Sequence, residues 1–546
     1  MRSTDANQPP PFEGRNLYLT DPGLRAAAAR EGAAWADDLL ATWGERLGSA
    51  ATLALAARAN RFAPELRTHD RFGERIDEVA FDPAWHELMG LAMRAGEHCQ
   101  PWAEPRPGAQ VARAASYLMH AEVENGTQCP LTMTYAAVPV LRHQVEAGPP
   151  VAECLRRALE REYDPRTLPI AAKRSALIGM GMTERQGGSD VRANTTRAEA
   201  AADGGYRLTG HKWFFSAPMC DAHLVLAQAP GGLSCFLLPR LLADGARNAV
   251  RLVRLKDKLG NRSNASAEVE FDGAWACRVG EEGRGIQVII EMVQHTRLDC
   301  AIGSAGIVRG ATARALHHAA HRRAFGLRLA EQPLMQNVLA DLTLETEAAT
   351  ALALRLARAF ESDAPPGDTA LARLATPAIK YWLCKRAATI VAEAMEVLGG
   401  NGYVEDSELP RLYREAPLNS IWEGSGNVMC LDVLRAAKRE PGAVEALVAE
   451  LELARGGDAR LDRHVGALGT TLRARNLDER DGRRIAADIA LALAGAILVR
   501  HAPRAMADAF CATRLADAAL AGLGTLPSQV DLLAVIERRI ERSLAS

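Results

Sequence analysis

The stretch Gly181-Met182-Thr183-Glu184-Arg185-Gln186-Gly187-Gly188-Ser189-Asp190 is the most informative part of this 546-residue chain. Its glycines let backbone N–H groups approach a ligand closely. The hydroxyls of Thr183 and Ser189 can bond carbonyl or phosphate oxygens. From these residues alone, an ordinary glycine-rich turn is a simpler interpretation than a ligand cradle.

The same stretch marks a change in the predicted secondary structure. Residues 16 to about 160 are rich in Ala, Leu, Arg and Glu and have few β-branched runs, which predicts mostly helix. From Ile178 to about Gly285, short apolar runs between turns predict strands instead. These predicted strands cover 206–208, 223–228, 233–238 and 267–271.

Helix is predicted again after Gly285, over 286–320, 333–360 and 376–398. The prolines and glycine of 361–368 predict a turn, and the glycines of 399–402 predict a helix end. After Glu440, Leu461, Val465, Leu468 and Leu472 have the spacing of one buried helix face. The predicted domains are an N-terminal arm with helices (1–177), a β-domain (178–285), a helical bundle (286–438) and a further helical domain (439–546).

The composition is that of a soluble globular protein, with 48% hydrophobic residues, 24% charged residues and a net charge of −2. The net charge of the whole chain therefore predicts no polyanion partner, but it does not exclude a local basic patch. The ten cysteines form no CxxC pair, which excludes the common zinc and dithiol motifs. The first residues lack the apolar run of a signal peptide, and the apolar stretch 491–499 is about half a membrane span. We expect a reduced, cytoplasmic protein without a membrane segment.

A second stretch with possible chemistry is Ile421-Trp422-Glu423-Gly424-Ser425-Gly426-Asn427. A carboxylate held in an apolar pocket has a raised proton affinity and can act as a base. On spacing alone, a surface glutamate in a turn explains Glu423 equally well. Of the histidines at 317, 318 and 321, two lie one helical turn apart. No pattern in the sequence supplies a third metal ligand for them, so no metal site is predicted.

Together these segments resemble the signatures of the acyl-CoA dehydrogenase family. Residues 181–193 are similar to the first signature, a small residue followed by Met-Thr-Glu and Gly-Gly-Ser-Asp. Residues 396–415 are similar to the second, Glu-x-x-Gly-Gly-x-Gly-Tyr with later acidic and basic positions. The segments 258–262, 280–285 and 322–326 resemble further landmarks, so the resemblance covers about residues 80–437.

This resemblance implies an α+β fold with an N-terminal helical domain, a central β-domain, a four-helix bundle and an extra C-terminal helical domain. It implies FAD as the cofactor, which agrees with the lack of a Rossmann fingerprint or phosphate loop. The implied reaction is α,β-dehydrogenation of an acyl thioester, with Glu423 as the base and Arg297 near it. The implied FAD-contact residues are Met180, Gly181, Met182, Thr183, Gly187, Gly188, Ser189, Phe214, Phe215, Ser216, Arg322, Phe325, Ile421, Trp422, Glu423, Gly424, Ser425, Gly426 and Asn427.

Within that family, the chain resembles the AidB branch. The matching segments are 16–19, 30–33, 81–86, 210–216, 255–266 and 420–434. The resemblance implies an FAD-bound homotetramer of the adaptive response to DNA alkylation, with at most weak isovaleryl-CoA dehydrogenase activity. It also implies binding of double-stranded DNA through the C-terminal region. The alternative is a metabolic short- or branched-chain acyl-CoA dehydrogenase whose C-terminal domain serves oligomerisation.

The residues themselves give DNA binding little support. Residues 438–546 carry 16 basic and 15 acidic side chains. The densest basic stretch is 473–484, where a solvated helix face explains five arginines as well as a DNA footprint does. Contacts there are expected to be with phosphates, hence non-specific and salt-sensitive. The DNA-binding candidates are Arg435, Arg473, Arg475, Arg480, Arg483 and Arg484.

Overall fold

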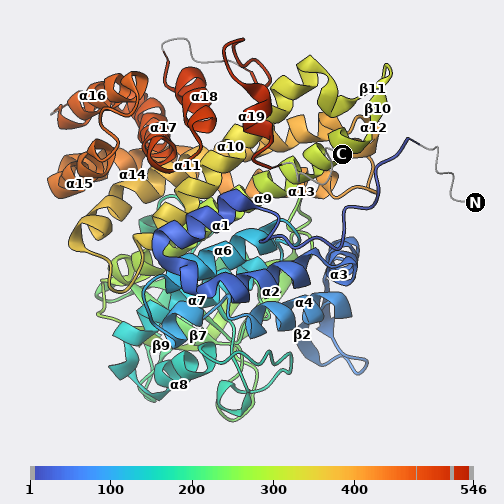
Figure 1. The fold of residues 1–546 in the computed structure, drawn as a ribbon. Coiled ribbons are helices and arrows are strands. Elements are labelled where there is room, and N and C mark those ends of the chain that lie inside the picture. Colours follow the sequence, from blue (N-terminus) through green and yellow to red (C-terminus); the bar gives the residue numbers. More distant parts are fainter. Residues whose placement is uncertain (1–6, 475, 517–521, 540–546) are drawn as a thin grey trace, which may run out of the picture. The chain divides into compact units, whose positions relative to one another are not determined.

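The computed structural model (Figure 1) describes residues 7–474, 476–516 and 522–539. The chain divides into two compact units. Unit 1 contains the chain up to Leu53, Arg106–Val123 and the chain from Arg297 on. Unit 2 contains Ala54–Pro105 and Glu124–Thr296. Both helices and a large sheet are present, so the predicted α+β class is confirmed. The division into four domains stays a prediction.

Unit 2 is built around a seven-stranded sheet. Its strands are β3 (Ile178–Gly181), β4 (Arg197–Ala200), β5 (Tyr206–Ser216), β6 (Ala222–Ala229), β7 (Gly232–Pro239), β8 (Val250–Leu255) and β9 (Ser266–Val279). The pairing order is β3-β6-β4-β5-β9-β7, and β6 also pairs with β7, so five strands close into a ring. Side chains such as Phe215, Phe236 and Phe271 fill its core. All four predicted strand segments lie within β5, β6, β7 and β9.

The helices of unit 2 precede and follow this sheet. They include α4 (Pro83–Arg94), α7 (Gln128–His143) and α8 (Pro149–Ala158), as the helical prediction for 16–160 requires. That prediction missed a hairpin of β1 (Glu65–His69) and β2 (Arg75–Ala80). The hairpin alternates charged and single apolar residues, which is a weak signal beside the Ala-rich helices on either side. Gly73, at φ +85°, makes its turn.

Unit 1 consists mainly of helices. They are α1 (Pro22–Ala28), α2 (Asp37–Gly48), α6 (Ala109–Ala121), α9 (Gly285–His321), α10 (Pro333–Arg358), α11 (Pro366–Val397), α13 (Leu409–Glu415), α14 (Gly426–Arg439), α15 (Pro441–Glu452), α16 (Ala459–Arg473), α17 (Gly482–His501), α18 (Arg504–Arg514) and α19 (Leu532–Ile536). Helix α11 packs against α10, α14, α15 and α17 (Figure 1). Helix α17 is buried along most of its length, which explains the apolar stretch 491–499 as a core helix. Among the described helices, none is long and apolar enough to cross a membrane.

The predicted bounds of the long helices agree with the structure except at α11. Helices α9 and α10 match their predictions to within two residues at each end. Helix α11 begins at Pro366, ten residues before the predicted start at Thr376. Pro377 resembles a first-turn proline, and proline is usual there, yet here it lies inside the helix. Leu461, Leu468 and Leu472 of α16 are buried, as their spacing predicts.

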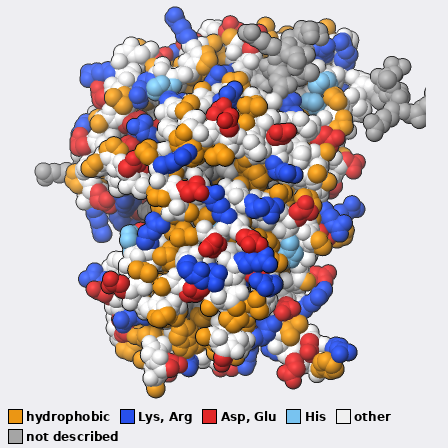
Figure 2. All heavy atoms as spheres, turned by 60° about the horizontal axis from the view of Figure 1, so that its bottom comes forward, with side chains coloured by type: hydrophobic (Ala, Val, Ile, Leu, Met, Phe, Trp, Pro, Cys, Tyr) orange, Lys and Arg blue, Asp and Glu red, His pale blue; other side chains and the backbone are white. Residues whose placement is uncertain are grey.

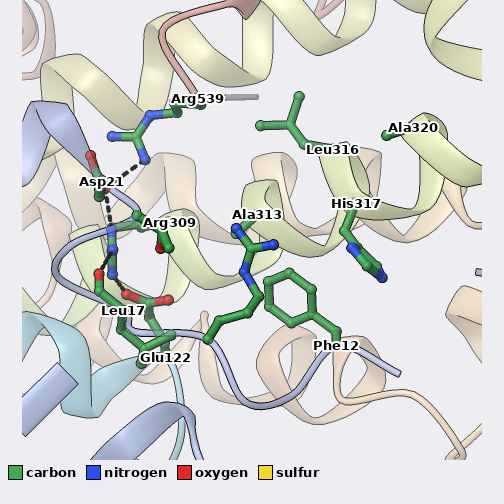
Figure 3. A pocket seen from close by; sticks show the side chains of 12 residues that line it. Phe12, Leu17, Asp21, Glu122, Arg309, Ala313, Leu316, His317, Ala320 and Arg539 are labelled. Carbon is green, nitrogen blue, oxygen red and sulfur yellow. Dashed lines mark hydrogen bonds and ion pairs between the residues drawn. The ribbon is translucent and has the colours of Figure 1, made fainter. Parts of the chain in front are cut away.

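A buried ion cluster in unit 1 joins the segment before α1 to α9 and to the chain after α19 (Figure 3). The carboxylate of Asp21 accepts hydrogen bonds from Leu24 N at 3.0 Å, from Arg539 at 2.8 Å and from Arg309. Arg309 also pairs with Glu122. A cavity of about 50 Å³, the size of a few water molecules, lies beside the cluster.

Replacing Asp21 with Asn is expected to lower the free energy of unfolding by about 2 kcal/mol at pH 7, because hydrogen bonds to charged groups are lost. Burial alone would raise the pKa of Asp21, but Arg539 and Arg309 outweigh it and hold the pKa below its usual value. The stabilisation is therefore complete above about pH 4 and is lost as the pH falls further. Urea unfolding at pH 7 and pH 3 should show the gap between parent and variant narrowing at pH 3. An equal gap at both pH values would contradict this role for Asp21.

Candidate active site

The glycine-rich stretch of unit 2 leaves the sheet at the end of β3 and turns back onto β5. The N–H of Trp213 donates to the carbonyl of Thr183 at 2.8 Å. A Cβ on Gly181 would lie 2.5 Å from the ring of Phe215, and a Cβ on Gly188 would lie 2.4 Å from the Thr183 hydroxyl. These close approaches explain why both positions are glycine. The structure thus brings the predicted residues 180–189 next to 213–216.

Glu184 anchors this turn. Its carboxylate is fully buried and accepts hydrogen bonds from Lys212 Nζ at 2.9 Å, Thr195 N at 2.7 Å and Thr196 N at 3.1 Å. Burial alone would raise the pKa of Glu184, but Lys212 and the hydroxyl and N–H donors lower it to about 2. The glutamate of the Met-Thr-Glu signature is therefore a structural ion and faces no ligand.

Strand alternation separates the roles of Phe214 and Phe215. The side chain of Phe214 is 51% exposed, whereas that of Phe215 is 2% exposed and belongs to the core. On the face that carries the Phe214 ring, Phe215 therefore offers a ligand only its backbone. The Lys256 ammonium lies 3.6 Å from the ring centre of Trp213 and 4.8 Å from that of Phe214. Phe214 and the half-buried Ser216 and Thr183 give unit 2 a surface with one aromatic face and two hydroxyls.

In unit 1, Glu423 lies in a strained loop directly before α14. Its φ of +57° is rare for a residue with a side chain, and Gly424 follows at φ +100°. Lys380, buried in α11, donates to the carbonyls of Asn419 (3.0 Å), Trp422 (3.0 Å) and Gly424 (2.8 Å). Backbone in this unusual conformation persists only when its surroundings hold it. Lys380 supplies three of the contacts that do so.

Arg297 holds the same loop from α9. Its Nε donates to the carbonyl of Glu423 at 3.1 Å, and its Nη1 binds Asp432 at 2.8 Å. Asp432 is shared with Arg373 at 3.0 Å. Arg297 is thus confirmed as a neighbour of Glu423, and it contacts the backbone of the loop. The Glu423 side chain is half-buried. The peptide carbonyl before it binds Lys380, and its own carbonyl binds Arg297.

The other predicted flavin contacts of unit 1 lie in a different element. Arg322 follows α9, and Phe325 lies in the turn between β10 (Arg323–Ala324) and β11 (Leu327–Arg328). Phe325 has φ +52° and is 99% exposed.

Three family models match consecutive parts of the chain. Residues 7–165 match the model of the adaptive response protein AidB N-terminal domain. Residues 179–274 and 283–438 match the acyl-CoA dehydrogenase middle and C-terminal domains. The chain is 52% identical to AidB of Escherichia coli (strain K12) over 93% of its own length and 94% of that protein. The chain belongs to the AidB branch of the acyl-CoA dehydrogenase family.

Solved structures give the same fold for this AidB-branch chain. Caenorhabditis elegans ACDH-11, solved in complex with C11-CoA, is 28% identical with a TM-score of 0.83, and the match covers 100% of this chain and 94% of that one. The apo form of Bd2924 is 29% identical with a TM-score of 0.81, covering 91% and 99%. The predicted branch and the acyl-CoA dehydrogenase fold are both confirmed.

The DNA-binding candidates of the AidB-branch chain are mostly paired with carboxylates. Arg473 binds Glu445 at 3.2 Å, Arg480 binds Asp478 at 2.5 Å, and Arg484 binds Asp481 at 3.2 Å. Arg435 lies 3.8 Å from Asp432. Arg483 donates to Asn427 Oδ1 at 2.9 Å, which ties it to the Glu423 loop. Arg475 lies outside the described residues.

On the face shown in Figure 2, Lys and Arg side chains are interspersed with Asp and Glu.

Two of the histidines at 317, 318 and 321 contact backbone carbonyls. His317 Nε2 lies 2.9 Å from the carbonyl of Pro10, and His321 Nδ1 lies 2.8 Å from the carbonyl of His317. Among the described residues, no group of three or more His, Cys, Asp or Glu could hold a metal ion.

Sequence reasoning missed the residues that hold the site in place, namely Glu184, Lys212 and Lys380. A signal existed for the lysines, because the chain has only 7 Lys against 58 Arg. A lysine inside an apolar helix or strand of such a chain is a candidate for a buried role.

Proposed function

We propose that this chain is an FAD flavoprotein of the adaptive response to DNA alkylation, which binds double-stranded DNA and acts at most weakly on acyl-CoA. The dehydrogenase part is carried by one observation: Glu423 is held in a strained loop by Lys380 and Arg297. The alkylation-response part is supported by the family model that matches residues 7–165.

FAD is the cofactor, as predicted, since the chain belongs to a flavoprotein dehydrogenase family with FAD-complexed structural neighbours. The residues of each unit fit a flavin. Unit 2 offers Thr183, Ser189 and the glycine N–H groups for polar atoms, and the exposed ring of Phe214 for an aromatic face. Unit 1 offers the loop 421–427, Arg322 and Phe325. When bound, FAD accepts the two electrons released by the substrate.

Glu423 is the base that removes the α-proton of an acyl thioester in this proposal. A general base must be held at the reacting carbon in a fixed orientation. Lys380 and Arg297 supply that constraint through the carbonyls of the loop backbone. The complex of ACDH-11 with C11-CoA supports an acyl-CoA as the substrate class.

The nearly complete exposure of Phe325 supports an oligomer. An aromatic ring at the tip of a hairpin buries apolar area when a second subunit covers it. We infer a homotetramer in which this turn contacts a neighbouring subunit. The ten cysteines are all buried and none is in a disulfide, which supports the proposed cytoplasmic location.

DNA binding is tested by charge reversal in the full chain, because α15 and α17 pack on α11 and truncation would uncover that helix. The triple variant Arg473→Glu, Arg480→Glu and Arg484→Glu is expected to weaken duplex binding about tenfold or more at low salt. A gel-shift titration at several salt concentrations measures it. The affinity of the parent should also fall steeply with salt, because phosphate contacts release counterions.

The matched control is Arg58→Glu, Arg156→Glu and Arg207→Glu, whose side chains are also exposed and paired with a carboxylate. Equal weakening in both triple variants would show that the footprint is not at 473–484. If the parent does not bind duplex DNA at low salt, the alternative is favoured, a metabolic short- or branched-chain acyl-CoA dehydrogenase. The carboxylate pairing of the arginines is the observation that supports this alternative.

A further inference from the structure

A second pocket lies wholly within unit 2. Its volume is about 240 Å³, and residues of β2, β5, β6, β7, β8 and β9 line it. Its apolar part consists of the buried side chains of Phe215, Leu238 and Leu252 together with two prolines. The rest of the lining is charged or polar, so the pocket offers both kinds of contact that a small organic ion needs. The volume suits a small molecule much better than an acyl-CoA.

Four arginines line the pocket, and three of them are paired. Arg75 binds Asp77 at 2.8 Å, Arg247 binds Glu78 at 3.0 Å, and Arg251 binds Asp272 at 2.8 Å. Their positive charge is therefore already balanced by carboxylates of the chain.

Arg240 is the exception. Among the described residues, no carboxylate forms an ion pair with it, and its side-chain hydrogen bond goes to the Met219 carbonyl at 3.4 Å. Two nearby acids are already bound by other cations, Asp221 by Lys173 at 2.7 Å and Glu78 by Arg247 at 3.0 Å. Burial lowers the pKa of Arg240, yet the group stays charged because its ordinary pKa is so high. A partly buried cation that forms no close ion pair is costly, and a bound anion would lower that cost.

His223 adds a second unsatisfied group to the pocket lining. Its ring stacks on Phe215 with centroids 4.0 Å apart. Its Nε2 is buried and has no hydrogen-bond partner among the described residues. Burial lowers the pKa of His223 to about 3, so the ring is neutral and adds no charge to the pocket.

We propose that this pocket binds a small organic carboxylate, with its carboxylate on Arg240 and its hydrocarbon or aromatic part on Phe215, Leu238 and Leu252. One guanidinium without a close ion pair fits one negative charge, and its planar fork fits the two oxygens of a carboxylate. The buried apolar side chains favour an organic anion over inorganic phosphate, which would bring a larger charge and no apolar surface. The site is separate from the flavin-binding role proposed above.

Calorimetric titration of the FAD-loaded full chain with sodium benzoate tests the proposal. Benzoate should bind the parent, and Arg240→Gln should weaken binding about tenfold or more, because a charge-assisted hydrogen bond is lost. Arg251→Gln is the matched control and should bind like the parent, since Arg251 is exposed and paired with Asp272. Sodium phosphate in place of benzoate should give no binding.

A second variant covers the case in which Arg240→Gln does not fold. Ala249 is exposed at the pocket, so Ala249→Trp should fill it without disturbing the core and should abolish benzoate binding. No binding of benzoate to the parent at about 10 mM would overturn the proposal. So would equal binding by the parent and Ala249→Trp, or phosphate binding as tight as that of benzoate.

Discussion

Replacing Glu423 with Gln is expected to slow reduction of the bound flavin by an acyl-CoA by roughly 10²–10⁴-fold, the usual contribution of a general base. Glutamine has nearly the same shape as glutamate but cannot take a proton. The loop should keep its conformation, because Lys380 and Arg297 bind its backbone carbonyls. The flavin should therefore stay bound while proton removal fails.

The measurement is anaerobic mixing with isovaleryl-CoA while the flavin absorbance is followed. Flavin content is determined from the absorbance before mixing, which separates a loss of cofactor from a loss of chemistry. Glu440→Gln is the matched control, since Glu440 lies at the other end of α14 and pairs with Arg373. If Glu423→Gln is reduced as fast as the parent, Glu423 is not the base and the dehydrogenase part of the proposed function fails.

The fold class could be predicted because it rests on signature glycines, and a larger residue at these positions would clash with its neighbours. Gly181 and Gly188 sit where a Cβ would meet Phe215 and Thr183. Close backbone approaches of this kind allow one residue type only, so they leave a readable pattern in the sequence. The strands of unit 2 were predicted for a similar reason, because their apolar runs are bounded by turn residues.

The parts that were missed depend on contacts between distant segments. The sequence shows Glu184 only as part of a signature. The structure is needed to show that its partners are Lys212, Thr195 and Thr196. Pro377 suggests a helix start because no local pattern shows the ten helical residues before it. Side-chain direction was partly predictable, since strand alternation alone means that Phe214 and Phe215 point to opposite faces.

The same limit applies to the cations of the site. Arg297 was expected near Glu423 from the family resemblance, but its contact with the loop carbonyl follows only from the packing of α9 against the loop. Lys380 lies between Ile379 and Tyr381, where a charged residue would be expensive without partners. Its three carbonyl partners come from a loop about forty residues later in the chain. A sequence can show that such a lysine needs partners without showing which ones.

Replacing Lys212 with Met is expected to lower the free energy of unfolding by about 3–5 kcal/mol, the usual cost of leaving a buried charge without its partner. Both side chains of the Lys212–Glu184 pair are fully buried, so no solvent reaches the remaining carboxylate. Glu184 also holds the turn that carries Thr183, so the variant should bind less FAD. Urea unfolding and the flavin content of the purified variant measure the two effects.

The double variant Glu184→Gln with Lys212→Met should recover most of the lost stability, because exchanging both charges for neutral groups is often nearly neutral. The pH dependence has a definite sign. In the parent, the Glu184 pKa of about 2 lies below that of an unfolded glutamate, so its stabilisation is complete above about pH 5 and is lost toward pH 2. The gap between parent and Lys212→Met should therefore narrow as the pH is lowered. If the double variant is as unstable as Lys212→Met, the cost comes from lost packing of the lysine stem and not from an unpaired carboxylate.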